Sequence, residues 1–150
     1  MATKFKFDKV LANVNQLKQE LPRVLANDAV RYFNDSFRQQ GWDGQRWQTP
    51  KRKIPGTYEY EYPKKNAKTR RSRAILVQSG RLRRAVATSV RVVSFQLIRF
   101  VVDLPYAAIH NQGGPIKGGV MPQRKFMGDS KTLRNLQRAK IKAALDKIWK

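Results

Sequence analysis

The side chains that most often perform chemistry in proteins are scarce in this sequence. His110 is the only histidine, there is no cysteine, and the ten carboxylates stand singly except for Glu59 and Glu61. A catalytic histidine needs a nucleophile or an orienting carboxylate beside it, and a metal site needs further ligands. Asp103 is the only acid near His110 in the sequence. We therefore interpret His110 as a structural residue that hydrogen-bonds a turn.

Two further patterns resemble functional sites but lack essential residues. Glu59 and Glu61 would share one face of a strand, where we interpret them as a solvated pair among lysines. Gly113 and Gly118 have the separation of the glycines in a phosphate-binding loop, but Gly119 stands where that motif requires lysine. The sequence predicts no catalytic, metal-binding or cofactor-binding residue, and the chain is expected not to be an enzyme.

Positive charge is the dominant chemical feature of the chain. Its 150 residues carry 32 Lys and Arg against 10 Asp and Glu, a formal net charge of +22. Residues 46–91 hold 14 of the basic and 2 of the acidic side chains. Such a segment suits the phosphates of DNA, the alternative being an ordinary solvated face. The candidate nucleic-acid-facing residues are Lys64, Lys65, Lys68, Arg70, Arg71, Arg73, Arg81, Arg83 and Arg84.

Hydrophobic periodicity predicts helices at both ends of the chain. From Asp8, a candidate N-cap, apolar residues recur at helical spacing until Gly41 stops the pattern. At Pro22 either the helix kinks or a second helix begins. Ser130 is a candidate cap for a last, amphipathic helix, which we expect to pack on a sheet. The apolar stripe of that helix is Leu133, Leu136, Ile141, Ala144, Leu145 and Ile148.

Between these helices the sequence predicts short strands. The alternation TYEYEY at 57–62 favours a strand, and Ser79 is placed to cap a short helix. Alternating, β-branched residues over 86–92 and 95–101 indicate two strands or one long bent strand.

Two segments, around 42–73 and 111–122, show no sustained helical or strand spacing of apolar residues and are predicted to be extended loops. Trp42 and Trp47 are placed to pin the first loop to the core. No apolar run approaches the ~20 residues that span a bilayer, and the N-terminus lacks the apolar core of a signal peptide. The expected architecture is one α+β domain over 1–150, with N-terminal helices, a central antiparallel β-sheet with a long basic loop, and a C-terminal amphipathic helix.

Several motifs follow one another in an order that resembles a known family. They are FRQQGWDGQRW, ILVQSGRLRRAV, PYAAIHNQGG and MPQRKFMG, followed by the amphipathic helix. This order is similar to that of the phage virion morphogenesis (tail completion) family, over roughly Phe5 to Lys150, with the basic insert 51–73 the least typical part. The positions that carry the resemblance are Gly80, Leu82, Tyr106, His110, Gly113, Gly114, Pro122, Arg124 and Phe126.

The resemblance implies a structural virion protein of a tailed bacteriophage and no enzyme. Such a protein would complete the tail and join it to the head, as a homo-oligomeric ring of six or twelve subunits around the DNA channel. Its partners would be its own copies, other neck and tail proteins, and genomic DNA contacted without sequence specificity, with no membrane and no small-molecule substrate. It would be assembled in the host cytoplasm and end in the virion. Charge and length alone also fit a stand-alone basic nucleic-acid-binding protein of ribosomal type.

Overall fold

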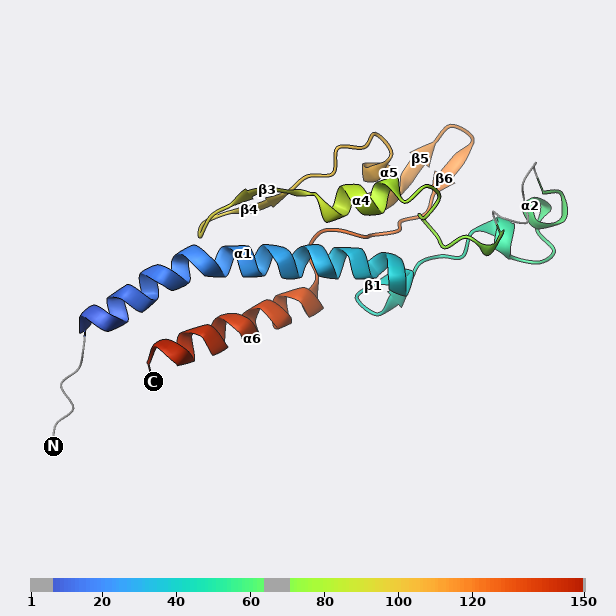
Figure 1. The fold of residues 1–150 in the computed structure, drawn as a ribbon. Helices are drawn as coiled ribbons and strands as arrows, with labels where there is room; N and C mark the ends of the chain where they lie inside the picture. The colour runs from blue at the N-terminus through green and yellow to red at the C-terminus, as the bar shows by residue number, and fades with distance from the viewer. Residues whose placement is uncertain (1–6, 64–70, 150) are drawn as a thin grey trace.

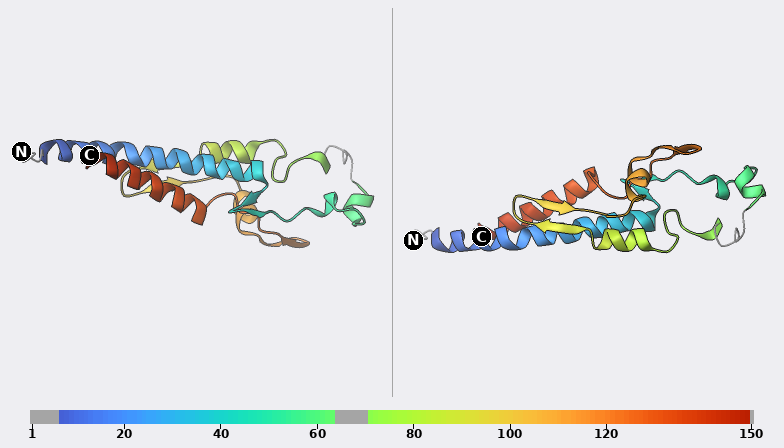
Figure 2. Two further views of the ribbon diagram at one scale, coloured as in Figure 1. Left: turned by 90° about the horizontal axis from the view of Figure 1, so that it is seen from below. Right: turned by 90° about the horizontal axis from the view of Figure 1, so that it is seen from above.

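The computed structural model describes residues 7–63 and 71–149, and its outline is elongated (Figure 1). A long helix, α1 (Phe7–Gln39), runs along one half of the molecule, and α6 (Lys131–Ile148) lies beside it in the opposite direction. The short helix α4 (Arg81–Ala87) and the hairpin of β3 (Val90–Val93) and β4 (Ile98–Phe100) follow another side of α1. The start of α1 and the end of α6 therefore lie at the same end of the molecule (Figure 2).

One uninterrupted helix of 33 residues accommodates Pro22, so no second helix begins at that proline. The helix starts at Phe7, which places Asp8 in the first turn, where a carboxylate favours the helix dipole, rather than at the N-cap. Ala26, Ala29, Phe33 and Phe37 are buried at spacings of three and four. This stripe is the face that the periodicity predicted, and it directs the C-terminal half of α1 into the core.

The described strands form three separate antiparallel hairpins rather than one central sheet. They are β1 (Gly41–Trp42) with β2 (Gln45–Arg46), β3 with β4, and β5 (Gly114–Ile116) with β6 (Gly119–Met121). A turn closes the second hairpin, in which Ser94 N donates to Leu97 O at 2.9 Å. Two strands are therefore present there, not one bent strand, and the α+β class is confirmed.

The predicted strand at 57–62 is wrong, because α2 (Tyr58–Glu61) is a helical turn. The rings of Tyr58 and Tyr62 lie 5.0 Å apart, a pairing that residues four apart make on a helix. Thr57 supports this turn by donating its hydroxyl to Lys51 O at 2.7 Å or Ile54 O at 2.8 Å. Local hydrogen bonding outweighs the alternation here, because none of the hairpins formed by the described residues includes this segment.

The two expected loops contain short regular elements. The segment 42–73 includes the β1–β2 hairpin, the 3-10 turn η1 (Lys51–Lys53) and α2. The segment 111–122 begins at the end of α5 (Ala107–Gln112) and continues into the β5–β6 hairpin. The two segments expected to be extended loops therefore carry short regular elements.

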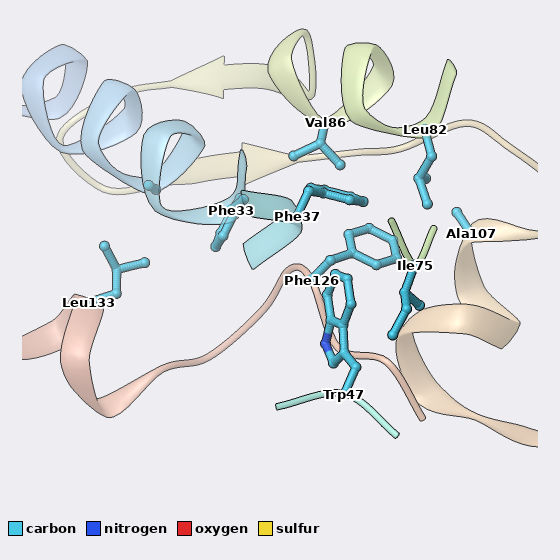
Figure 3. Packing of buried hydrophobic residues seen from close by; sticks show 10 residues of the cluster. Phe33, Phe37, Trp47, Ile75, Leu82, Val86, Ala107, Phe126 and Leu133 are labelled. Carbon is cyan, nitrogen blue, oxygen red and sulfur yellow. The ribbon is translucent and has the colours of Figure 1, made fainter. Parts of the chain in front are cut away.

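The core lies where the C-terminal half of α1 meets four other segments (Figure 3). Phe37 packs against Trp47 and Phe126, with ring centroids 5.8 Å and 5.5 Å apart. The indole of Trp47 donates to Lys125 O at 2.8 Å, so this tryptophan pins its loop to the core as predicted. The cluster is completed by Ala29, Phe33, Ile75, Leu82, Val86, Ala107 and Leu133.

Helix α6 packs along α1 and not on a sheet, which corrects the expected location of its stripe. Ser130 caps the helix as predicted, since its Oγ accepts from Leu133 N at 3.0 Å. Leu133 is buried, whereas Leu136 is 54% exposed and Trp149 is 67% exposed. Among the described helices, none is both long and apolar enough to cross a membrane.

Candidate functional site

The described part of residues 48–73, which we call the basic arm, projects past the core at the end opposite to the start of α1 (Figure 1). It contains η1 and α2, and two of its tyrosines, Tyr58 and Tyr62, are 74% and 69% exposed. Tyr60 instead lies under Arg71, whose guanidinium carbon is 4.1 Å from the ring centroid. The arm therefore presents cations and two open aromatic faces away from the core.

The candidate nucleic-acid-facing residues have different surroundings. Lys64, Lys65, Lys68 and Arg70 lie outside the described residues. Arg71 is half-buried, stacks on Tyr60 and donates to the Tyr60 carbonyl, so it holds the arm together. The candidates that are exposed to solvent are Arg73, Arg81, Arg83 and Arg84.

The arm, α4 and α5 line a cavity of about 640 Å³ that is open to solvent on one side, which we call the cationic cavity. Five of the positions that carry the family resemblance line it, although they come from three separate segments of the chain. Arg52, Arg73 and Arg81 line it as well, and no acidic residue is among the described residues on its wall. The five positions are Gly80, Leu82, Tyr106, His110 and Arg124.

His110, Arg124 and Arg52 line both this cavity and a second one of about 880 Å³, which extends toward the β5–β6 hairpin. Arg124 N donates to His110 O at 2.8 Å, which joins the end of α5 to the segment after β6. Burial, and then the nearby Arg124 charge, lower the pKa of His110. His110 Nδ1 is buried and has no hydrogen-bond partner within the described residues, so this nitrogen does not bond a turn.

The other resemblance positions are structural. Gly113 has φ of 72°, and a Cβ there would lie 2.8 Å from Gln123 N, so only glycine fits. Phe126 is 1% exposed in the core. Gly114 pairs with Met121 at the base of the β5–β6 hairpin, and Pro122 follows that hairpin on the wall of the second cavity.

Sequence reasoning missed Asn111, which fixes the segment that carries Arg124 and Phe126. Its Oδ1 accepts from Phe126 N at 2.9 Å and Met127 N at 3.1 Å, and its Nδ2 donates to Met127 O at 3.0 Å. An asparagine before two glycines is typical of a turn, so the sequence contained no indication of this long-range role.

Sequence reasoning also missed a polar cluster at the start of α6, formed by Tyr32, Asp43 and Ser130. The hydroxyls of Tyr32 and Ser130 each donate to Asp43 Oδ1 at 2.5 Å. Lys131 N donates to Asp43 Oδ2 at 3.2 Å. The cluster joins α1, the β1–β2 turn and α6, and we interpret its role as holding these three elements together.

Within 7–63 and 71–149, no group of three His, Asp or Glu side chains is placed to hold a metal ion. The site thus consists of exposed cations, open aromatic rings and a cavity with buried positive charge. Neither a curated protein nor a solved structure matches this chain. The model of one family, described as the phage virion morphogenesis family, matches residues 2–146. Because this match spans nearly the whole sequence and includes every segment that forms the core, the chain belongs to the phage virion morphogenesis family.

Proposed function

We propose that the chain is the subunit of a closed ring at the head-proximal end of a phage tail, where it completes the tail and joins it to the head. Membership of the family gives the chain a structural role in the phage virion. The ring, its place in the neck and the DNA in its lumen are our proposal. They rest on which side chains the subunit leaves exposed.

The observation that carries the proposal is the exposed apolar surface of the α1–α6 pair. In α6, Leu136 is 54% exposed and Leu145 is 42% exposed. Nine residues separate them, about two and a half helical turns, so they lie on opposite flanks of the helix. In α1, Phe7 and Leu11 are 65% and 49% exposed. Soluble monomers rarely leave so many large apolar side chains exposed, so we infer that another copy of the chain buries them.

Two different apolar flanks favour a ring over a two-fold dimer. A dimer pairs one surface with itself, whereas a ring joins one flank of each subunit to the other flank of the next. The net charge of +22 then has a physical role, because cations that face a central channel are screened by the phosphates of DNA without base recognition.

Self-association tests this proposal. We expect light scattering and native mass spectrometry of the purified chain to show one closed oligomer with a fixed number of subunits. Leu136→Glu and Leu145→Glu should each give monomers, because a charge on either flank opposes burial of that flank.

Asn135→Glu is the matched control, since Asn135 is exposed on the same helix and the change in charge is identical. It should leave the oligomer intact. A wild-type chain that stays monomeric at about 100 μM, or a control that dissociates the oligomer as fully as Leu136→Glu, would contradict the proposal.

A further inference from the structure

The cationic cavity has a wall that is held in an unusual backbone conformation. Leu76 has φ of 60°, a left-handed conformation that a bulky residue rarely adopts. The side chain of Gln40 holds the adjacent residue, because its amide accepts from Ile75 N and donates to Ile75 O at 3.2 Å. Backbone of this kind persists only where its surroundings fix it, and it is concentrated at binding sites. The wall is therefore formed before any ligand arrives.

Arg124 carries a charge that no acidic side chain on the described wall of the cavity balances. Arg124 is only 7% exposed, and its Nε is buried without a partner. Its other nitrogens have long contacts with neutral acceptors, 3.4 Å to Gln48 O and 3.6 Å to Met121 Sδ. The ion pairs found among the described residues do not include it. Burial, and then the charge of Arg52, lower the pKa of Arg124.

No missing part of the chain supplies an acidic side chain to this arginine. Residues 1–6 and 64–70 contain no Asp or Glu. A buried guanidinium without a carboxylate is costly, and proteins normally pair such a group. The cavity therefore has the positive charge of an anion site and an arginine that is only weakly hydrogen-bonded within the described chain.

We propose that the cationic cavity binds an acidic side chain of a partner protein, whose carboxylate pairs with Arg124 beneath the rim formed by Arg73 and Arg81. This goes beyond the proposed ring, because the cavity is separate from the exposed flanks of α1 and α6. The two terminal nitrogens of Arg124 make only the long contacts with neutral acceptors given above, and a carboxylate in the cavity replaces them with charged hydrogen bonds.

A protein carboxylate fits the cavity better than a phosphate of duplex DNA. The phosphates of a duplex lie on a broad convex surface, which cannot bring one of them to a side chain that is 7% exposed. A Glu or Asp side chain on an extended segment can enter such a cavity. The apolar walls from Ile75, Leu82 and Tyr106 also suit the carbon atoms of a peptide rather than a sugar–phosphate backbone.

The single histidine allows a direct test, because only His110 contributes imidazole C–H signals in proton NMR. We would titrate the full-length protein with a capped hexaglutamate peptide in 150 mM salt. Binding should shift the His110 signal and raise the pKa of His110, because the carboxylate offsets the Arg124 charge that lowers it. Arg124→Gln and Arg81→Gln should each weaken binding about tenfold or more, as loss of a charged hydrogen bond does.

Arg83→Gln is the matched control, because Arg83 is exposed on α4 like Arg81 but does not line the cavity. It should change the affinity less than twofold. Arg81→Gln also covers the case in which Arg124→Gln fails to fold, because exposed positions tolerate substitution.

Three outcomes would overturn the proposal. The first is no shift of His110 at millimolar hexaglutamate. The second is equal weakening by Arg83→Gln and Arg81→Gln, which would indicate attraction by overall charge. The third is a 12-base-pair DNA duplex that shifts His110 through Arg124 with equal or higher affinity. None of these results depends on whether the chain forms a ring.

Discussion

Asp43 connects three elements through one carboxylate. It has φ of 49°, in the turn between β1 and β2, and receives hydrogen bonds from Tyr32, Ser130 and Lys131 N. Burial opposes its charged form, but the hydrogen bonds from Ser130, Tyr32 and Thr132 outweigh burial and lower the pKa of Asp43 to about 2. The carboxylate also lies at the N-terminus of α6, where the helix dipole favours negative charge.

We predict that Asp43 makes the stability of the protein sensitive to acid. Because its pKa in the folded state is depressed, its contribution is complete above the ordinary value of 3.8 and is lost as the pH falls toward about 2. Asp43→Asn keeps the left-handed turn but removes the charge, and should lower the free energy of unfolding at pH 7 by about 1 kcal/mol. Urea unfolding at pH 7 and at pH 2.5 measures both effects.

The variant should lose less stability than the wild type between these two pH values. Asp35→Asn is the control, because Asp35 forms an exposed pair with Arg38 at 3.1 Å. It should change stability at pH 7 by no more than about 0.5 kcal/mol. Parallel pH profiles for Asp43→Asn and the wild type would mean that the Asp43 carboxylate does not contribute to stability.

At the scale of single residues, the sequence predicts roles that are local. Ser130 is recognisable because a capping hydroxyl acts on an amide three residues away. Asp43 acts on Ser130 across 87 positions, and Asn111 on Phe126 across 15, so neither pairing appears in a local pattern. The convergence of Gly80, Tyr106 and Arg124 on one cavity is likewise a property of the folded chain.

Among the helices, α6 has an apolar stripe that is only partly covered within the chain. Leu133 belongs to the core cluster with Ala29 and Phe33 of α1, whereas Leu136 is on the flank and half-exposed. The apolar stripe of α6 is wider than its contact with α1. This width is consistent with our proposal that α6 also packs against a neighbouring subunit.

We predict effects of different size for two leucines of α6 that lie one turn apart. Leu133→Ala should destabilise the isolated subunit by about 2–5 kcal/mol, because Leu133 is buried and its loss leaves a cavity. Leu136→Ala should change the stability of the isolated subunit by about 0.5 kcal/mol or less. Denaturant unfolding at concentrations below self-association measures both. Similar losses for the two variants would show that Leu136 is covered within the subunit.

The sequence predicts the long helices better than the short strands. Helices α1 and α6 repeat their pattern over many turns, so one proline or one misplaced residue does not hide them. The alternation at 57–62 is too short to outweigh local hydrogen bonds, and Val86 begins an apparent strand but belongs to α4. The turn of the β1–β2 hairpin is Asp43-Gly44, a dipeptide typical of such hairpins, so the sequence contains a signal for this turn.

At the scale of the whole molecule, the uneven distribution of positive charge predicts that the chain binds DNA without sequence preference. Duplexes of unrelated sequence should bind with equal affinity, and that affinity should fall steeply with salt, because phosphate contacts release counterions. Replacing both Arg83 and Arg84 by glutamine should reduce the slope of log affinity against log salt by about two. Fluorescence anisotropy at several salt concentrations measures the slope.

The matched control is the double replacement of Arg31 and Arg138 by glutamine, which removes the same charge from the exposed surfaces of α1 and α6. It should change the slope less than the α4 replacement does. An equal change would mean that DNA contacts no particular part of the subunit, and a preference for one duplex would mean base recognition.

The position of the chain in the particle is the central claim, and electron cryomicroscopy of the phage that carries it is the most direct test. We predict a closed ring of identical subunits at the head-proximal end of the tail, with the α1–α6 pairs side by side and the DNA channel through its centre. Fitting the subunit should place the flanks that carry Leu136 and Leu145 in contact between neighbours. Purified particles that lack the chain, or density for it at the distal end of the tail, would contradict the account.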